Sequence, residues 1–447
     1  MKIDTGNTAW MITATAFVLL MTPGLAFFYG GMTRAKSALN MMMMSFVSMV
    51  AVTVTWTLYG HSMAFDTFGE ADGLVNGFVG GADAFGLQSL VGAVTGDDGT
   101  GMPSLVFSAF QLTFAIITVA LISGAIADRA RFGAWVVFSV AWATLVYFPV
   151  AHWVWGGGWL ADLGIEDFAG GTVVHVNAGA AGLALALVLG RRVGWPEDPM
   201  RPHNLPMVLL GAGLLWFGWF GFNAGSELAV DGTAGLAFIN TQIAAATAAG
   251  AWLVVEKLRD GHSTSLGIAS GAVAGLVAIT PACGFVDPWA AGALGAVAGT
   301  ACACAVGLKR RFGYDDSLDV VGVHLVGGAI GAVALGLVAR YPFAPGQNQG
   351  LVYGGPISQL AVQAIGPVAV GLYSFGMAWI IGKAIDRTMG FRVTAQEEMT
   401  GLDLTTHAES GYDLGRGSGA SPYGSPKAAV SAVSPVSAMS SGRPPSP

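Results

Sequence analysis

Eleven apolar runs, each of about 17–25 residues, follow one another along this chain. A helix of about 20 apolar residues crosses a bilayer core that is about 30 Å thick, so each run predicts one membrane-spanning helix. Charged residues make up 11% of the chain and hydrophobic residues 53%, whereas about 25% of the residues of a soluble protein are charged. We therefore predict an all-α membrane protein in a lipid bilayer. The predicted spans are 8–31, 42–65, 104–127, 133–152, 171–190, 206–224, 233–256, 265–285, 288–308, 319–339 and 356–383.

The charges between the spans alternate in sign. The loops after the odd-numbered spans are basic, with Arg34, Lys36, Arg129, Arg131, Arg191, Arg192, Arg201, Lys257, Arg259, Lys309, Arg310, Arg311, Arg387 and Arg392. The other loops are mainly acidic, as with Asp66, Glu70, Asp162, Glu227 and Asp287. Because Lys and Arg gather in cytoplasmic loops, we expect the N-terminus outside and the C-terminus in the cytosol. The net charge of −7 argues against nucleic-acid binding.

The composition divides the chain into three parts. Residues 1–383 hold all the predicted spans, and 384–412 form a polar segment on the cytosolic side. Residues 413–447 are rich in Gly, Ser, Pro and Ala, a composition that cannot bury a core, and are predicted to be a disordered tail. The first span resembles a signal peptide in position, but Lys2 is the only base before it and no cleavage motif follows. We interpret it as a mature helix.

Two histidines lie inside apolar spans, His175 in span five and His324 in span ten. Each is followed by Gly at +4, Ala at +5 and Gly at +7, which suggests a duplicated unit. Five spans per unit is an odd number, so the two units must have opposite topology, and inverted repeats place their site near the membrane midplane. An ionisable group in a membrane helix marks a pathway or relay by default. The alternative is a histidine bonded to a neighbouring helix carbonyl. We expect no metal, because no acid or Cys lies within one turn of either ring.

Acids and aromatic residues accompany these spans. Asp167 lies eight residues before His175, and Asp319 opens span ten; each is able to hold the local field negative or to cap its helix. Phe110 and Phe114 lie in span three, and Trp155 follows span four. Aromatic belts at the membrane interface account for many such rings, whereas a cation site needs them because their π faces replace lost hydration. Composition leaves both interpretations open.

Eight motifs in the sequence are specific enough to point to a protein family. They are PGLAFFYGG (23–31), FQLTFAIITVALI (110–122), HWVWGGG (152–158), DFAGGTVVHVNAG (167–179), RPHNLPM (201–207), WFGFNAGS (219–226), TPACGF (280–285) and DVVGVH (319–324). In order and spacing they resemble the ammonium transporter family (Amt/Mep/Rh), on its Amt branch, over about residues 8–412. Members of the Rh branch would lack the residues of the fourth and sixth motifs as they stand in this sequence. The resemblance implies a homotrimer, each protomer having eleven transmembrane helices in two inverted five-helix repeats plus a last helix.

The resemblance also implies roles for single residues. Phe110, Trp155 and Ser226 match the external site that recruits NH4+. Phe114 and Phe222 match the phenyl pair that closes the pore below that site, and His175 and His324 match the twin histidines of the apolar lumen. Asp167 matches an essential acid that acts indirectly. The ion is deprotonated at the gate and NH3 crosses the lumen, with or without a separate proton transfer through the histidines.

The same resemblance indicates partners and location. Segment 390–412 resembles the family's C-terminal region, which helps a PII-type signalling protein to block the pore exits. We expect a multi-pass protein of the cell membrane, plasma or inner, that is not an enzyme and needs no cofactor. The alternatives are an ammonium sensor signalling through its cytosolic tail, or an intramembrane hydrolase. A sensor would carry a signalling domain and a hydrolase a catalytic constellation, and we find neither in the sequence.

Overall fold

The computed structural model describes residues 2–67, 73–96, 100–340 and 349–412. Within these ranges, ten helices are long and apolar enough to cross a membrane. The predicted span 265–285 falls on a shorter apolar helix, α12 (Ser265–Ile279), of 15 residues. This helix ends early because Pro281 lacks a backbone N–H and its ring clashes with a helical neighbour. An all-helical protein with ten candidate spans is thus confirmed, whereas a count of eleven stays a prediction.

The helices follow the predicted apolar ranges closely. The first half of the chain contains α1 (Thr5–Met32), η1 (Ala35–Ser37), α2 (Ala38–Thr55), η2 (Trp56–Gly60), α3 (His61–Phe65), α4 (Gly73–Asn76), η3 (Phe85–Leu90), α5 (Ser104–Ile122), η4 (Ser123–Ile126), α6 (Phe132–Trp142), η5 (Ala143–Tyr147), α7 (Phe148–Trp155), α8 (Trp159–Asp162), η6 (Gly171–Val176) and α9 (Asn177–Leu189). The second half contains α10 (Leu205–Gly225), α11 (Gly232–Asp260), α12, α13 (Pro288–Ala305), α14 (Leu308–Phe312), η7 (Val321–Leu325), α15 (Val326–Val338), η8 (Leu351–Tyr353), α16 (Ile357–Thr388), α17 (Ala395–Thr400) and α18 (Leu402–His407).

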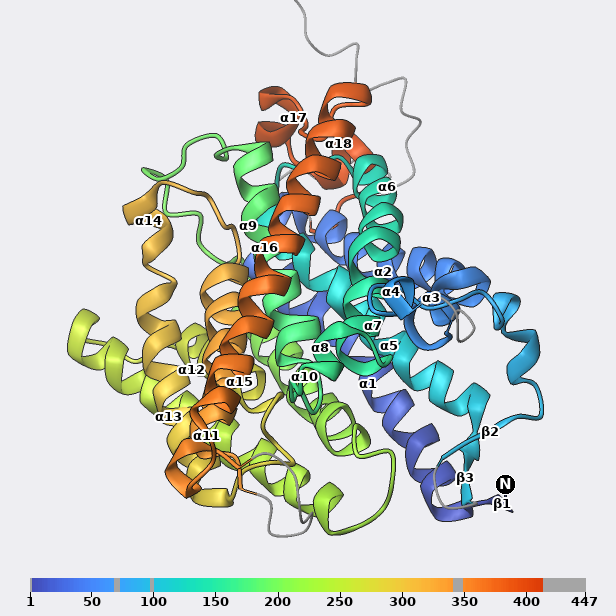
Figure 1. The fold of residues 1–447 in the computed structure, drawn as a ribbon. Coiled ribbons are helices and arrows are strands. Elements are labelled where there is room, and N and C mark those ends of the chain that lie inside the picture. The colour runs from blue at the N-terminus through green and yellow to red at the C-terminus, as the bar shows by residue number, and fades with distance from the viewer. Residues whose placement is uncertain (1, 68–72, 97–99, 341–348, 413–447) are drawn as a thin grey trace, which may run out of the picture.

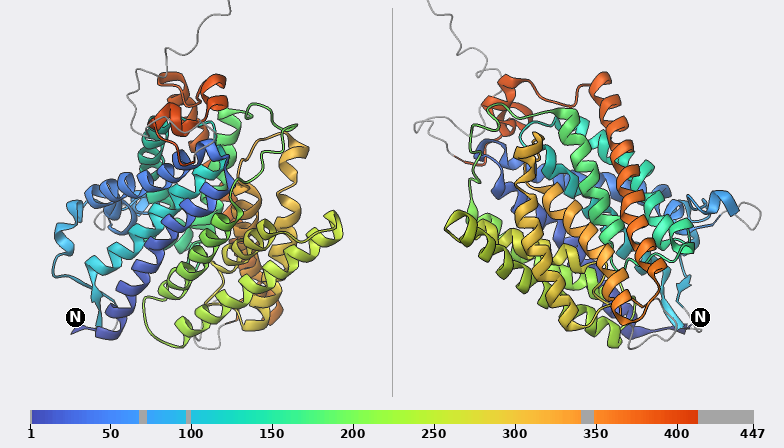
Figure 2. Two further views of the ribbon diagram at one scale, coloured as in Figure 1. Left: turned by 180° about the vertical axis from the view of Figure 1, so that it is seen from behind. Right: turned by 60° about the vertical axis from the view of Figure 1, so that its left-hand side comes forward.

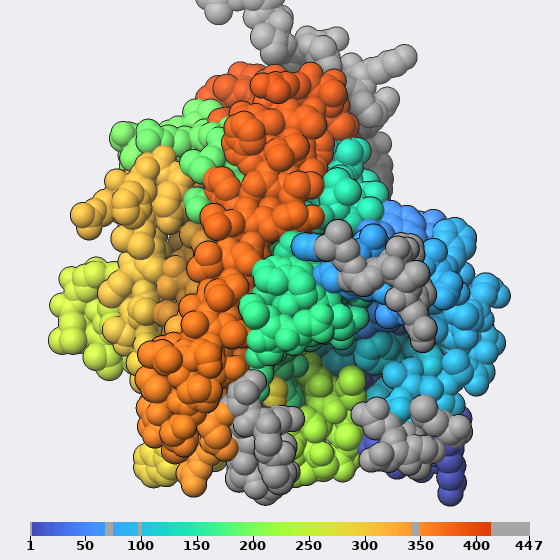
Figure 3. Space-filling model, in the orientation of Figure 1, coloured from blue at the N-terminus to red at the C-terminus, as the bar shows by residue number. Residues whose placement is uncertain are grey.

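The helices pack side by side into one bundle (Figures 1 and 2). The N-terminal strand β1 lies at one end of the bundle, and α17 and α18 lie at the other. Helix α16 runs down the front face, as the space-filling view shows (Figure 3). Residues 73–96, which include α4 and η3, project from one side. The predicted tail, 413–447, lies outside the described residues.

A small sheet ties the N-terminus to the segment before α5. Its strands are β1 (Lys2–Ile3), β2 (Val94–Thr95) and β3 (Thr100–Pro103), in the order β1-β3-β2. Strand β1 runs parallel to β3, with Lys2 opposite Thr100, and β2 runs antiparallel to β3. The side chain of Asp4 then caps α1 by accepting the backbone N–H of Asn7 at 2.8 Å. The first span therefore begins at a fixed position.

Candidate functional site

The two histidines meet in the middle of the bundle. Their Nδ1 atoms lie 3.2 Å apart, and the ring centroids lie 5.3 Å apart with the planes inclined by 24°. Both rings are almost fully buried. Each histidine lies in a short π-helical turn, His175 in η6 and His324 in η7, at the start of the α-helix that follows. Such π turns occur frequently at functional sites.

The contact between the two Nδ1 atoms constrains the protons on the rings. An N–H···N bond needs a donor and an acceptor, so one ring carries its hydrogen on Nδ1 while the other has a bare Nδ1 and carries its hydrogen on Nε2. Two doubly protonated rings would bring two N–H donors, and two charges, together at this distance. The Nε2 atom of His175 has no hydrogen-bond partner within the described ranges. The contact therefore excludes two doubly protonated rings, and a pair of neutral rings with opposite tautomers satisfies it.

The glycine four residues after each histidine allows the pair to form. A Cβ atom on Gly179 would lie 2.5 Å from the backbone nitrogen of Leu325, beside His324. A Cβ atom on Gly328 would lie 2.8 Å from the carbonyl oxygen of Gly171 and 2.9 Å from the Cβ of His175. Each histidine segment thus supplies the gap in which the other histidine segment sits. This close approach explains the shared sequence context of the two histidines.

A narrow cavity adjoins the histidine pair, and its walls are almost entirely apolar. It is lined by Met21, Leu25, Phe28, Ile117, Leu121, Val174, His175, Leu215, Trp219, Phe222, Val273 and His324. Because the only ionisable side chains in this wall are the two histidines, the cavity suits a small neutral molecule far better than a bare ion.

A column of aromatic rings continues from the histidines toward the β1 end. Phe222 lies 6.1 Å from His175 and stacks on Phe114, with 4.1 Å between centroids and 27° between planes. The edge of Phe114 then meets Trp155 at 5.9 Å and 88°, and Phe110 at 4.9 Å and 61°. Four of the residues matched to a recruitment site and gate therefore form one contiguous cluster.

The remaining predicted site residues border this cluster. Ser226 ends α10, and its hydroxyl donates to the carbonyl of Phe222 at 2.8 Å. The indole N–H of Trp155 donates to the backbone carbonyl of Asp167 at 2.9 Å, which fixes the ring. Phe110 is fully buried, whereas Trp155 and Ser226 are half-buried. Trp155 and Ser226 are thus the members of the predicted recruitment site that solvent reaches.

Asp167 is a buried helix cap. Its carboxylate accepts four backbone N–H groups, from Gly170 at 3.0 Å, Gly171 at 2.6 Å, Thr172 at 2.9 Å and Val173 at 3.0 Å. These N–H groups at the start of η6 have no acceptor within the helix, and negative charge is favoured at a helix start. Asp167 therefore holds the turn that carries His175, in agreement with an indirect role.

The corresponding position before His324 is occupied by Asp316, not by Asp319. The Asp316 carboxylate accepts the backbone N–H groups of Val320 at 3.1 Å and Val321 at 2.7 Å, at the start of η7. Asp316 lies eight residues before His324, the spacing of Asp167 to His175, and burial raises the pKa of Asp316 to about 6. The carboxylate of Asp319 instead pairs with Lys309 at 2.6 Å, where both side chains are half-buried.

Removing the two carboxylates should have unequal effects. Asp316→Ala leaves two buried N–H groups without an acceptor, at about 1–3 kcal/mol each, so we expect ammonium transport to fall at least tenfold. Asp319→Asn, the control, keeps a residue that tolerates the positive φ of 64° and loses only a half-buried ion pair that does not touch η7. We expect its transport to stay within about twofold of wild type. Equal losses in both variants, measured as flux in proteoliposomes, would contradict the assignment of Asp316.

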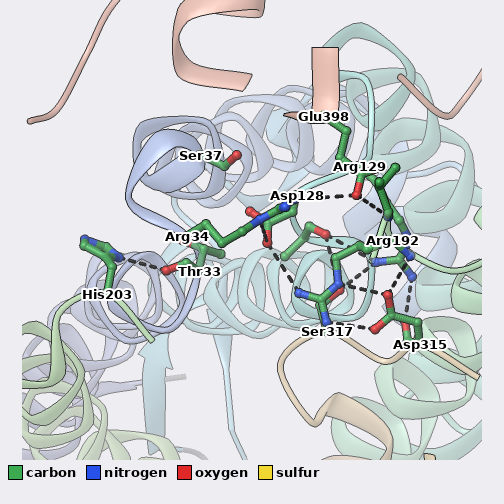
Figure 4. A network of polar contacts seen from close by, with 12 residues as sticks. Thr33, Arg34, Ser37, Asp128, Arg129, Arg192, His203, Asp315, Ser317 and Glu398 are labelled. Atoms are coloured by element: carbon green, nitrogen blue, oxygen red, sulfur yellow. Dashed lines mark hydrogen bonds and ion pairs between the residues drawn. The ribbon is translucent and has the colours of Figure 1, made fainter. Parts of the chain in front are cut away.

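A cluster of ion pairs holds the basic loops together at the opposite end of the bundle (Figure 4). Arg192 is buried and binds Asp315 at 2.8 Å and Asp128 at 3.3 Å. Asp128 also binds Arg34 at 3.1 Å, and Arg34 approaches Glu398 at 3.6 Å. Burial by itself would raise the pKa of Asp315, but the hydrogen bonds and charge of Arg192, together with Arg129, hold it below its ordinary value.

The segment after α16 docks on these loops. The fully buried carboxylate of Glu398 accepts the backbone N–H of Val193 at 2.7 Å and pairs with Arg392 at 2.9 Å. Asp403 caps α2 by accepting the N–H groups of Leu39 at 3.1 Å and Asn40 at 2.8 Å. Residues 395–407 therefore pack on the bundle as part of the fold.

Sequence reasoning missed several residues of this site. Asp316 was detectable, because its spacing to His324 repeats that of Asp167 to His175. Trp219 lies within a quoted motif, but nothing in the sequence shows that its ring faces His175 at 5.5 Å and 21°. Glu398 and Asp403 were counted only as part of a polar segment, because their partners are distant in the chain.

Three comparisons with known proteins agree with this geometry. The model of the Ammonium Transporter Family matches residues 9–412. The ammonium transporter of Mycobacterium tuberculosis (strain ATCC 25618 / H37Rv) is 54% identical over 445 residues, which cover 93% of this chain and 92% of that protein. The ammonium transporter of Aquifex aeolicus (strain VF5) is 49% identical over 417 residues, which cover 92% of this chain and 95% of that protein.

Solved structures share the fold. The crystal structure of Saccharomyces cerevisiae Mep2 matches with a TM-score of 0.81 and 34% identity, covering 88% of this chain and 91% of that one. A sensor Amt protein matches with a TM-score of 0.82 and 30% identity, covering 90% of this chain and 98% of that one. The curated relatives named here are transporters, which points to a multi-pass transport protein rather than an enzyme. This chain belongs to the ammonium transporter family.

Proposed function

We propose that this protein recruits NH4+ from outside the cell, removes its proton and conducts NH3 through the apolar cavity. The observation that carries the proposal is the hydrogen-bonded pair of His175 and His324, buried in an apolar wall directly behind the stacked rings of Phe114 and Phe222. A bare ammonium ion would lose most of its hydration in such a cavity, at a cost of many kcal/mol. Neutral NH3 avoids that cost, and K+, which has no proton to lose, is excluded.

The recruitment site combines Trp155, Phe110 and Ser226. The Trp155 ring and the Ser226 hydroxyl are partly exposed at the β1 end of the aromatic cluster, where a π face and an oxygen can replace water around a cation. Phe114 and Phe222 form the gate. Asp167 acts indirectly, because its four N–H contacts leave little of its carboxylate for a cation.

Family membership supports the larger arrangement that we propose. Residues 1–383 form the transport domain, with eleven spans, two inverted repeats, an outer N-terminus and a cytosolic C-terminus, in a homotrimer in the cell membrane. Segment 384–412 is the regulatory part and faces a PII-type partner, and 413–447 is a tail. The packing of segment 384–412 against the basic loops supports a role for this segment at the pore exits. The sensor alternative is not favoured, because the curated relatives are named as transporters.

Purified protein in proteoliposomes on a solid-supported membrane tests the proposal. Pulses of ammonium should give a current or flux that equal pulses of potassium do not give. Because charge movement per ammonium is itself open, a pH-sensitive dye inside the vesicles records NH3 entry in parallel. Absence of both signals with ammonium would refute transport.

The histidine pair should determine selectivity. His175→Ala or His324→Ala removes one partner of the N–H···N bond and opens space that water can enter. Because water can hydrate an ion there, we expect these variants to conduct potassium as well as ammonium. His262→Ala is the matched control, because His262 is an exposed residue remote from the cavity. The measurement is the ratio of potassium to ammonium current. An unchanged ratio in both pair variants would reduce the pair to a packing role.

A further inference from the structure

Trp219 is the ring that lies flat against His175. It is buried, lines the cavity, and lies 5.5 Å from the imidazole with 21° between the planes. Its indole N–H points away from the cavity and donates to the hydroxyl of Thr280 at 2.8 Å. An indole N–H without an acceptor is costly in an apolar setting, so this bond fixes the ring in one position.

The Thr280 hydroxyl is itself held in place. It follows the last residue of α12, and its single hydrogen points toward the Leu276 carbonyl at 2.7 Å and Asn223 Oδ1 at 3.3 Å. Its lone pairs are therefore left for Trp219. The Asn223 amide in turn donates to the Thr241 hydroxyl at 2.9 Å, and that hydroxyl donates to a helix carbonyl. A buried chain of polar groups thus joins α10, α11 and α12 behind the cavity wall.

This chain of polar groups bears on the tilt of the His175 ring, because a hydrogen bond holds only one of the two ring nitrogens. Its Nδ1 contacts His324, and its Nε2 has no hydrogen-bond partner in the part of the chain that the structure describes. The plane of the imidazole therefore depends on the rings stacked on it, and Trp219 lies nearer to it than Phe222 does. A rotation of that indole would remove the flat surface against which His175 rests.

We propose that Thr280 is a positioning residue for the histidine pair, acting through Trp219. Its hydroxyl holds the indole flat against His175 and so keeps the Nδ1 of His175 directed at His324. The inference rests on the proposed function, since it assigns to Thr280 the alignment of the pair that excludes ions.

Thr280→Val tests the inference, because it removes the hydroxyl and almost preserves the shape of the side chain. We expect ammonium flux to fall about tenfold, since an unpaired buried N–H is enough to displace the ring, and the potassium-to-ammonium current ratio to rise. Thr280→Ser keeps the hydroxyl and should restore both values. Thr22→Val is the matched control, because the buried Thr22 hydroxyl has no hydrogen-bond partner within the described ranges.

A double-mutant cycle separates this route from a general loss of packing. Trp219→Phe keeps a ring on His175 but has no N–H, so Thr280→Val should change the current ratio no further in that background. An equal effect of Thr280→Val with and without the indole would overturn the inference, as would an unchanged distance between the two histidines in a cryo-EM structure of Thr280→Val. If the wild-type protein itself gives no ammonium signal, the proposed function fails, and that result is distinct from either outcome.

Discussion

Replacing Asp167 by alanine is expected to abolish ammonium transport. Four backbone N–H groups at the start of η6 would lose their acceptor in a buried setting, and each unsatisfied donor costs about 1–3 kcal/mol. The turn that carries His175 would rearrange to find other partners. We expect at least a hundredfold loss of ammonium flux, in keeping with the effect of a displacement of about 1 Å at a reacting centre.

Two further variants show whether the carboxylate acts as a cap. Asp167→Asn presents one oxygen and one NH2 group to four donors, so it should recover little of the flux. Asp4→Ala removes the cap of α1, which accepts one N–H at a part-buried site, and should cost about 1 kcal/mol of stability without loss of transport. Near-normal flux in Asp167→Ala, measured in proteoliposomes, would show that η6 does not need this cap.

The second large effect is expected at Arg192. Arg192→Met removes the direct ion-pair partner of Asp315, leaving only the charge of Arg129 nearby, and weakens the pairing of Asp128 in a buried cluster. Breaking a buried ion pair from one side costs about 3–5 kcal/mol, so we expect a large drop in the thermal midpoint of the detergent-solubilised protein. Because Val193 binds Glu398, limited proteolysis should also release the segment after α16 sooner.

Controls for Arg192 come from the same chain. Arg259→Met breaks an exposed ion pair with Asp260 and should leave the midpoint unchanged. Adding Asp315→Asn to Arg192→Met removes the uncompensated charge and should recover part of the loss. A midpoint of Arg192→Met equal to that of Arg259→Met would contradict the buried network.

The stability that the Arg192–Asp315 ion pair contributes should also depend on pH, in a direction that follows from the pKa of Asp315. Because the folded-state pKa of Asp315 lies below its ordinary value of about 4, its carboxylate stabilises the fold above that ordinary value. The contribution is lost as the pH falls through the folded-state pKa. The wild-type midpoint should therefore fall in acid, and that of Arg192→Met should fall less.

The helices were predictable from the sequence because lipid makes each span a continuous apolar run. The match is close even where a span contains π turns, as at 132–155, since these turns keep the run unbroken. Asp319 shows why single contacts were harder to predict. Its backbone has a positive φ, so its side chain turns to Lys309 while Asp316 reaches the helix start. Hydropathy carries no information on such a turn.

The hydrogen bonds behind the cavity could not be predicted from the sequence, for a related reason. Trp219, Thr280 and Thr241 lie on three helices, and their polar atoms meet only after the bundle has packed. The same holds for Glu398 and Val193, which are far apart in the chain. The resemblance of motifs identified most of the residues of the proposed site, but it could not show what holds them in place.

The gaps at Gly179 and Gly328 make the two histidine segments mutually dependent. The glycine gap that receives each histidine segment lies in the other segment, about 150 residues away in the chain. A larger side chain at Gly179 would press on the segment of His324, and one at Gly328 would press on the segment of His175. A substitution at either glycine is therefore felt first at the distant histidine and not at the one four residues before it.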